Sequence, residues 1–206
     1  YRDEGYMILE RAIPKPHLDL LREQSQIAMD RIDAQMDDEG TDKLGVWHGD
    51  TEDTLNFKNH RGSRYFIDNC FKRQTDLRQF LFSELMAELC RATLGDNAYL
   101  FWEQYVIKGA QKGKKFSWHQ DSGYVNYPDH KPYLSCWCAL DDMSEANGTV
   151  HLLPFSQVGI RSWVQHIVDD VSNDKVGYFG REPGLTVEME AGSIVAFPSL
   201  NFHSSG

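Results

Sequence analysis

Long apolar runs and an excess of basic residues are both missing from this sequence of 206 residues. No apolar stretch approaches the roughly 20 residues that a membrane-spanning helix needs, so we expect no membrane partner. The formal net charge is −10, and a chain of that charge repels phosphates unless its basic residues gather in one patch. We therefore expect no nucleic-acid partner either.

Cysteine is also scarce, and the four present do not form a recognisable metal cage. Only Cys136 and Cys138 are close in sequence, and one Cys-X-Cys lacks the second pair of a zinc site. No signal peptide is visible, although the chain begins at Tyr1 and a native N-terminus upstream stays open. These features predict reduced, mostly buried thiols in a cytoplasmic protein.

Internal repeats, low-complexity segments and linkers rich in proline, glycine or serine are absent as well. The apolar content of 41% fits a globular chain, and its length fits one core. We expect a single domain over residues 1–206, with a helical flank over 1–97 and a β-rich core over 98–206.

Two amphipathic helices are predicted in the flank. The first follows Pro14 and Pro16, and the second runs from about Thr75 to Leu94, with Gly95 as its stop. The apolar positions of the first are Leu18, Leu21, Ala28, Ile32 and Met36, and those of the second are Leu77, Leu81, Leu85, Met86 and Leu89. Residues 37–63 are polar and aperiodic and predict a long loop.

From Tyr99 onward the chain predicts short strands separated by turn residues. The predicted strands are Tyr99–Lys108, Phe116–Gln120, Tyr133–Leu140, Thr149–Leu153, Leu185–Met189 and Ser193–Phe197. Asn147-Gly148 is a turn signal between two of them. Helices followed by many short strands favour a mainly β jelly roll, cupin-like, with flanking N-terminal helices.

His119-Gln120-Asp121, followed by His203, is the pattern that points to chemistry. On a strand the side-chain period is two, so His119 and Asp121 face the same side. His203 lies at the edge of a strand late in the fold and can complete the set. Two histidines and one carboxylate are the ligands of non-haem Fe(II) oxygenases, which leave three coordination positions open.

The motif alone has other readings. His119 and Asp121 can form a surface hydrogen-bonded pair, and His203 can be an unrelated core histidine. We expect the other six histidines to be structural or exposed to solvent; they are His17, His48, His60, His130, His151 and His166.

An ordered set of motifs resembles the phytanoyl-CoA dioxygenase family, whose members are Fe(II)- and 2-oxoglutarate-dependent oxygenases on a double-stranded β-helix. The motifs are residues 116–121 (FSWHQD), 136–142 (CWCALDD), 147–149 (NGT) and 203–206 (HSSG). The resemblance covers roughly the whole chain and is densest after Tyr99. It implies that His119, Asp121 and His203 are the iron ligands, and that 2-oxoglutarate and O2 are the cosubstrates.

The resemblance also assigns three residues to the 2-oxoglutarate site. Trp137 takes the place of a tryptophan beside the cosubstrate, Ser205 that of a serine holding its carboxylate, and Gln104 loosely that of a polar residue facing it. A core tryptophan, a turn serine and a strand-edge amide are the alternative readings.

Two departures from the family pattern concern the cosubstrate. The family often has a Pro-Gly-Ser-His-like loop where this chain has residues 154–157 (PFSQ). The family also anchors the distal carboxylate with an arginine about ten residues past the second histidine, since a buried carboxylate needs a bidentate cation. The sequence ends three residues after His203, so we expect a C-terminal truncation.

The reaction implied by the resemblance is hydroxylation of an unactivated C–H bond of a small organic substrate, with release of succinate and CO2. Related halogenases carry a small residue in place of Asp121, so the carboxylate favours a hydroxylase.

Basic residues suggest an acidic substrate, although a solvated basic loop is the simpler reading. They are Lys112, Lys114, Lys115, Arg61 and Arg64. Aromatic residues that can line a pocket or fill the core are Trp47, Tyr65, Phe101, Trp102 and Trp118.

Two other classes stay open: a cupin-like metal-dependent lyase or hydrolase, and a catalytically inactive metal-binding paralogue.

Overall fold

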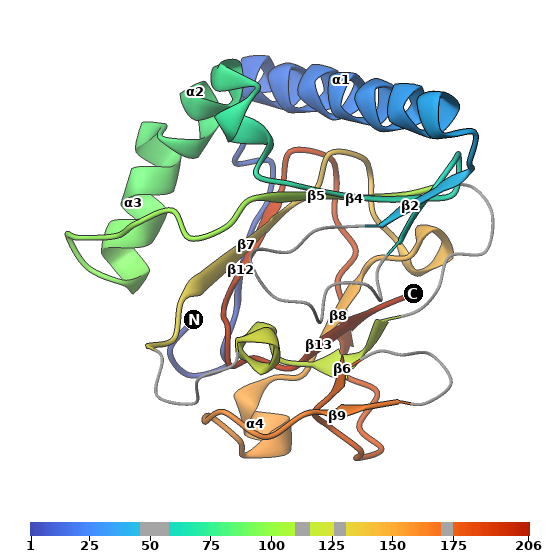
Figure 1. Cartoon of the computed structure of the whole chain (residues 1–206). Helices are drawn as coiled ribbons and strands as arrows, with labels where there is room; N and C mark the ends of the chain where they lie inside the picture. The colour runs from blue at the N-terminus through green and yellow to red at the C-terminus, as the bar shows by residue number, and fades with distance from the viewer. Residues whose placement is uncertain (46–57, 110–115, 126–130, 170–174) are drawn as a thin grey trace. The chain divides into compact units, whose positions relative to one another are not determined.

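The computed structural model describes residues 1–45, 58–109, 116–125, 131–169 and 175–206, which form two compact units (Figure 1). The first unit comprises Tyr1–Pro14, Cys90–Asp96 and Lys114–Gly206, and the second comprises Lys15–Leu89 and Asn97–Gly113. The organisation as a single domain with a helical flank over 1–97 stays a prediction. No helix in the described part of the chain combines the length and apolarity that crossing a membrane requires.

The first unit contains two antiparallel sheets and a short hairpin. One sheet has the order β1-β12-β7, with β1 at Met7–Leu9, β12 at Ile194–Pro198 and β7 at Leu134–Cys138. The other has the order β11-β8-β13-β6, with β11 at Leu185–Thr186, β8 at Val150–Leu152, β13 at His203–Ser205 and β6 at Phe116–His119. The hairpin pairs β9 (Ile167–Val168) with β10 (Lys175–Val176).

A buried apolar cluster joins the two sheets of the first unit. Val150 and Leu152 of β8 and Val195 and Phe197 of β12 are at most 3% exposed. Each pair is two residues apart, so it faces one side of its strand. Burial of one such side chain contributes about 1.5–3 kcal/mol, so this cluster is a main source of stability. Two antiparallel sheets that share one buried apolar cluster fit the predicted jelly roll.

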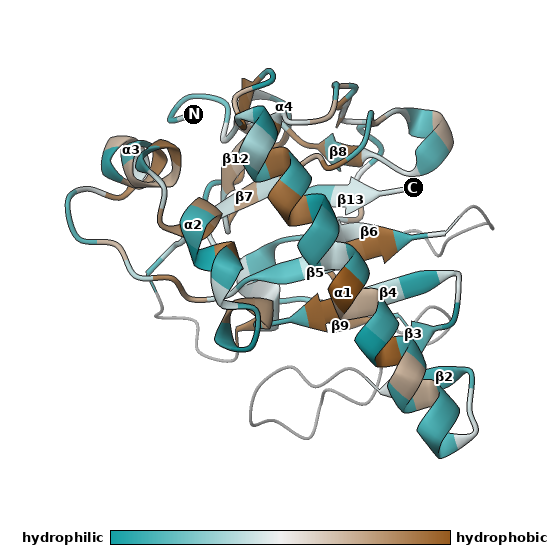
Figure 2. Cartoon of the chain, turned by 90° about the horizontal axis from the view of Figure 1, so that it is seen from above, coloured by the Kyte–Doolittle hydropathy of each residue, from teal (hydrophilic) through white to brown (hydrophobic). Residues whose placement is uncertain are grey.

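The second unit packs one long helix on an antiparallel sheet. The sheet has the order β2-β3-β4-β5, with β2 at Lys43–Gly45, β3 at Lys58–His60, β4 at Arg64–Asp68 and β5 at Gln104–Lys108. The helix, α1 (Lys15–Glu39), is held to the sheet by the Tyr105 hydroxyl, which donates to the Leu21 carbonyl, and by the Tyr65 hydroxyl, which donates to Asp33. Hydrophobic and hydrophilic residues alternate along α1 (Figure 2), as the predicted amphipathic helix requires.

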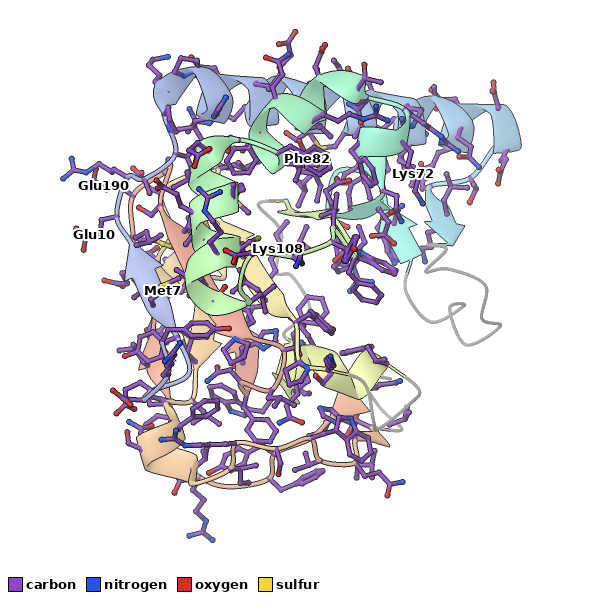
Figure 3. All side chains as sticks on the ribbon, turned by 90° about the vertical axis from the view of Figure 1, so that its left-hand side faces the viewer. Met7, Glu10, Lys72, Phe82, Lys108 and Glu190 are labelled. Carbon is purple, nitrogen blue, oxygen red and sulfur yellow. The ribbon has the colours of Figure 1, made fainter. Side chains whose placement is uncertain are left out.

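The second predicted helix is broken in the structure. Residues 75–94 form a 3-10 turn (Thr75–Leu77), α2 (Arg78–Leu81) and α3 (Glu84–Thr93). The backbone of Phe82 leaves the helical region (φ −113°, ψ 24°), and its ring, labelled in Figure 3, is 62% exposed. The Ser83 hydroxyl accepts a hydrogen bond from the Met86 amide, which is the position of a helix N-cap. The sequence predicted one continuous helix from about Thr75 to Leu94, with Ser83 in its interior, and this prediction was wrong.

The predicted loop over 37–63 was wrong at both ends. The helix α1 runs on to Glu39, and β2 and β3 pair with each other. Residues 46–57 of this segment lie outside the described residues.

The predicted strands are present but shorter than expected, and several small elements were not predicted. The strand at 99–108 begins only at Gln104, and the strand at 185–189 ends at Thr186. Besides β2 and β3, the additional elements are α4 (Phe155–Val158), β1, β4, β9, β10, β13 and the 3-10 turns at Cys70–Lys72, Asp121–Tyr124 and Glu145–Asn147.

Candidate metal centre

Strand pairing brings the two predicted histidine ligands together. His119 is the last residue of β6, His203 is the first residue of β13, and the two are direct partners in the antiparallel ladder. Their ring centroids are 4.2 Å apart. Residues far apart in sequence therefore meet because two neighbouring strands end and begin at the same level.

Asp121 joins this pair through a turn rather than a strand. Gln120 still has extended backbone (φ −104°, ψ 140°), which keeps Asp121 on the side of His119. The strand β6 has ended at His119, and a 3-10 turn begins at Asp121, so the strand does not continue through the motif. The Asp121 Oδ1 atom lies 3.9 Å from His119 Nε2 and 3.3 Å from His203 Nε2.

The hydrogen bonds of both imidazoles fit a bound metal ion. His119 Nδ1 lies 2.7 Å from the Ser117 carbonyl oxygen, and His203 Nδ1 lies 3.2 Å from the Asn201 carbonyl oxygen. A carbonyl accepts only, so each Nδ1 carries a proton and Nε2 is the ring nitrogen that is left to bind a metal ion. With the Asp121 carboxylate, the three ligand atoms lie within 4.8 Å of one another, and this donor set suits a divalent metal.

Burial and the shared carboxylate set the protonation of the site. Burial, and then the neighbouring His203, lowers the pKa of His119 to about 3, so its ring is neutral at pH 7. Burial alone would lower the pKa of His203, but the Asp121 carboxylate raises it above its usual value. Burial likewise opposes ionisation of Asp121, yet His203 and His119 hold the pKa of this carboxyl below its usual range. Asp121 is therefore ionised and ready to ligate.

Ser135, which sequence reasoning missed, fixes the second carboxylate oxygen. Its hydroxyl donates to Asp121 Oδ2 at 2.5 Å from the neighbouring strand β7. This bond leaves Oδ1 facing the two histidines. Nothing in the local sequence around Ser135 signals this contact, since it arises only when β7 packs beside the turn at Asp121.

The three predicted cosubstrate residues lie in different surroundings. Trp137, on β7 opposite Val195, packs against the apolar cluster and is partly buried. Ser205 lies on β13 opposite Val150, so it is a strand residue and not a turn serine. Gln104 lies in the second unit, where its amide donates to Asp68 Oδ1 at 2.5 Å. The role of each at the cosubstrate stays a prediction.

The predicted anion contacts are only partly described. Arg61 pairs with Asp37 at 2.7 Å and Asp42 at 3.0 Å, so its charge already has partners. Arg64 lies with its guanidinium carbon 5.1 Å from the centre of the Phe66 ring. The other predicted anion contacts lie outside the described residues; they are Lys112, Lys114 and Lys115. The same holds for Trp47, His48 and His130, which were considered for a pocket or as further histidines.

Two imidazoles and one carboxylate at the edge of a double-stranded β-helix are the donor set of the metal centre of non-haem iron oxygenases. A sequence comparison agrees, because the model of the phytanoyl-CoA dioxygenase family matches residues 1–206. The chain belongs to this family, which lies in the Fe(II)/2-oxoglutarate oxygenase superfamily. Fe(II) is the metal and 2-oxoglutarate the cosubstrate of the family.

The chain is also similar to a curated relative. It is 29% identical over 137 residues to the ectoine dioxygenase of Bordetella parapertussis, an alignment that covers 58% of this chain and 44% of the relative. The chain thus spans less than half the length of that relative.

The structural likenesses have lower identity and show the fold. EctD from S. alaskensis, solved with 2-oxoglutarate and 5-hydroxyectoine, has a TM-score of 0.70 at 19% identity and covers 99% of this chain and 67% of its own. The carbocyclase SnoK from nogalamycin biosynthesis, which is α-ketoglutarate-dependent, has a TM-score of 0.68 at 17% identity and covers 100% and 74%.

Proposed function

We propose that this chain is a 2-oxoglutarate-dependent non-haem iron dioxygenase. It hydroxylates an unactivated C–H bond of a small organic substrate and releases succinate and CO2. The observation that carries the proposal is the centre of His119, Asp121 and His203, with both Nε2 atoms and one carboxylate oxygen within 4.8 Å. Family membership supports the same chemistry.

The residues of this chain hold and orient the metal. The Nε2 atoms of His119 and His203 and the Oδ1 atom of Asp121 would bind Fe(II). The carbonyls of Ser117 and Asn201 keep the two rings in the tautomer that ligates, and Ser135 keeps the carboxylate from turning. When bound, Fe(II) with 2-oxoglutarate supplies the oxidising power for the C–H bond, so the protein contributes geometry and position.

Three further residues are proposed to position the cosubstrate. Ser205 is two residues past His203 on β13, a placement that supports a contact with a carboxylate of 2-oxoglutarate. Trp137 shares the face of β7 with Ser135, which binds Asp121, and this supports a place beside the cosubstrate. Gln104 is proposed as a polar contact of the cosubstrate, and the family pattern is the support for this role.

Hydroxylation is proposed in preference to halogenation because of Asp121. A carboxylate at this position occupies the coordination site that a halide would need. One of the similar structures is a carbocyclase, so oxidations other than hydroxylation compete with this proposal. The proposed substrate class is a small organic molecule. Its acidic character is proposed from Lys112, Lys114 and Lys115, which lie outside the described residues, and from Arg61 and Arg64.

The test is an anaerobic titration of the metal-free, full-length protein with Fe(II) and then 2-oxoglutarate. We expect a weak visible charge-transfer band that saturates near one equivalent, and succinate release once O2 and substrate are admitted. Metal binding without the band would instead support a lyase or hydrolase on the same ligands. Metal binding with neither the band nor any turnover would support a catalytically inactive metal-binding paralogue, and absence of metal binding would contradict the proposed centre.

Variants of the ligands separate the metal centre from the fold. His119→Ala or Asp121→Ala should abolish iron-dependent turnover while the protein stays folded, because each removes one of three ligands. The matched control is His151→Asn, since His151 lies on β8 and bonds Thr186 outside the centre. Near-normal turnover in either ligand variant would contradict the proposal.

A further inference from the structure

The two residues that flank Asp121 are completely buried and bonded to distant segments. Gln120 and Ser122 are both 0% exposed. Neither is a ligand, because the extended backbone of Gln120 turns its side chain away from the face of His119 and Asp121. A buried amide in the middle of a metal-binding motif needs partners elsewhere.

The Gln120 side chain joins three parts of the first unit. Its Nε2 donates to the Leu200 carbonyl at 2.7 Å and to the Ser162 carbonyl at 2.9 Å. Its Oε1 accepts from the Val164 amide at 3.0 Å. Leu200 is three residues before His203, so this amide ties the strand that ends in His119 to the turn that leads into His203.

His166 holds the backbone of the same residue. Its Nε2 accepts the Gln120 amide at 2.8 Å, and its Nδ1 lies 2.9 Å from the Val164 carbonyl oxygen. The ring packs directly on two glycines, since an added Cβ would lie 2.4 Å from the ring at Gly123 and 2.5 Å at Gly177. The ring is therefore fixed in place and needs the absence of side chains around it.

Ser122 repeats the arrangement on the other side of Asp121. Its amide donates to the Ser199 carbonyl at 3.0 Å, and its hydroxyl donates to the Ser199 hydroxyl at 2.7 Å. The Trp163 indole donates to the Ser122 carbonyl at 3.1 Å. Both neighbours of Asp121 thus bind the same two segments, residues 162–166 and 199–200.

We propose that Gln120 and His166 are positioning residues that set the spacing of the metal ligands. Metal affinity depends on ligand distances to within about 0.2 Å, and here the ligands come from separate elements, β6 with its following turn and β13. The side-chain amide of Gln120 bonds the turn that leads into β13, and the ring of His166 holds the backbone of Gln120 in place. The inference rests on the proposed metal function of His119, Asp121 and His203.

The test measures metal affinity and coordination geometry in folded variants. Gln120→Glu keeps the size of the side chain but removes both donors to Leu200 and Ser162. We expect the Kd for Mn(II) to rise by roughly 10- to 100-fold, the range for partners that orient metal ligands. We also expect altered visible bands of the Co(II)-loaded protein, because a change in ligand geometry moves them.

The matched control is Gln165→Glu, an exposed residue of the same segment. It adds the same charge, and charge alone would tighten cation binding in both variants. A weaker Mn(II) affinity in Gln120→Glu only therefore identifies geometry as the cause. An unchanged Kd in the folded Gln120→Glu protein would overturn the proposal.

Milder variants keep the test decisive if Gln120→Glu fails to fold. His166→Gln retains an acceptor for the Gln120 amide, whereas His166→Leu removes it, so the Mn(II) Kd should rise more in His166→Leu. Equal affinities in wild type and both variants would overturn the proposal. Failure of the wild-type protein to bind Mn(II) or Fe(II) would instead overturn the proposed metal function.

Discussion

At the scale of single residues, Ser135 tests whether the carboxylate orientation matters. Ser135→Ala removes the hydrogen bond to Asp121 Oδ2, and the carboxylate can then turn away from the histidines. We expect the Mn(II) Kd to rise by about 10-fold, the lower end of the range for such partners. Isothermal titration of the metal-free protein measures the change.

The control for this serine is Ser162→Ala. Ser162 is exposed, and only its backbone carbonyl takes part in the contacts of Gln120. Removing its hydroxyl should leave the Kd within twofold of wild type. An equal loss of affinity in both variants would show that Ser135 has no special role.

The cluster of candidate metal ligands could be predicted from the sequence, whereas the residues that hold it in place could not. His119, Asp121 and His203 are few, chemically distinctive and spaced in a known pattern. Ser135 is a common residue type, and its role exists only in three dimensions. His166 was expected to be structural or exposed, and the structure shows it bonded to the backbone of the motif.

At the scale of secondary-structure elements, two glycines have left-handed backbone, but only one of them is crowded by its neighbours. Substitutions at the two can therefore distinguish the cost of backbone strain from the cost of crowding. Gly159 (φ +68°), after α4, has open space around its missing Cβ. A Cβ on Gly184 (φ +72°), before β11, would lie 2.6 Å from the Trp118 ring and 2.7 Å from the Leu152 carbonyl oxygen.

Alanine substitutions at these two glycines should differ in cost. Gly159→Ala should cost about 1 kcal/mol, from the left-handed backbone alone. Gly184→Ala should cost about 3 kcal/mol, because overpacking adds to that strain. Urea unfolding gives both free energies, and equal values would contradict the crowding at Gly184.

A second prediction at this scale concerns β4 and β5, which place Arg64 directly opposite Lys108 (labelled in Figure 3). Burial, and then Arg64, lowers the pKa of Lys108 from 10.5 to about 8. Between these values the unfolded chain binds more protons than the folded one, so stability rises as the pH increases from about 8 to 10.5.

Lys108→Met should therefore stabilise the protein at pH 7, and the gain should shrink by pH 10. Urea midpoints at the two pH values measure it. The control Lys43→Met changes an exposed lysine of the same sheet and should change the stability at pH 7 much less than Lys108→Met does. A gain that persists at pH 10 would show that Lys108 is not the group that titrates.

Elements were predictable where the periodicity was strong and local. The buried positions of α1, including Leu18, Leu21, Ala28 and Met36, follow the predicted spacing. The break at Phe82 and Ser83 was missed because apolar spacing continues through it. The strands β2 and β3 were missed because their residues are polar and the strands form by pairing with each other.

At the scale of the whole molecule, metal binding should stabilise the folded chain. A ligand at 100 times its Kd adds about 2.7 kcal/mol. For a chain of this length that corresponds to a rise in Tm of roughly 5–10 °C. Calorimetry with and without excess Mn(II) measures the shift.

The control for this shift is His203→Ala, which lacks one ligand and should show almost no rise with Mn(II). Mn(II) is chosen because carboxylate and imidazole bind it while the thiols of an unfolded chain do not compete strongly. A rise of wild-type size in His203→Ala would mean that the stabilising ion binds elsewhere.

The pairing of His119 with His203 also sets the order of events during synthesis. The proposed metal centre needs β13 to pair with β6, and such long-range pairing is slow compared with helix formation. A growing chain on the ribosome therefore carries His119 and Asp121 for more than eighty residues before their partner exists. The proposed iron centre can therefore form only after β13 has left the ribosome.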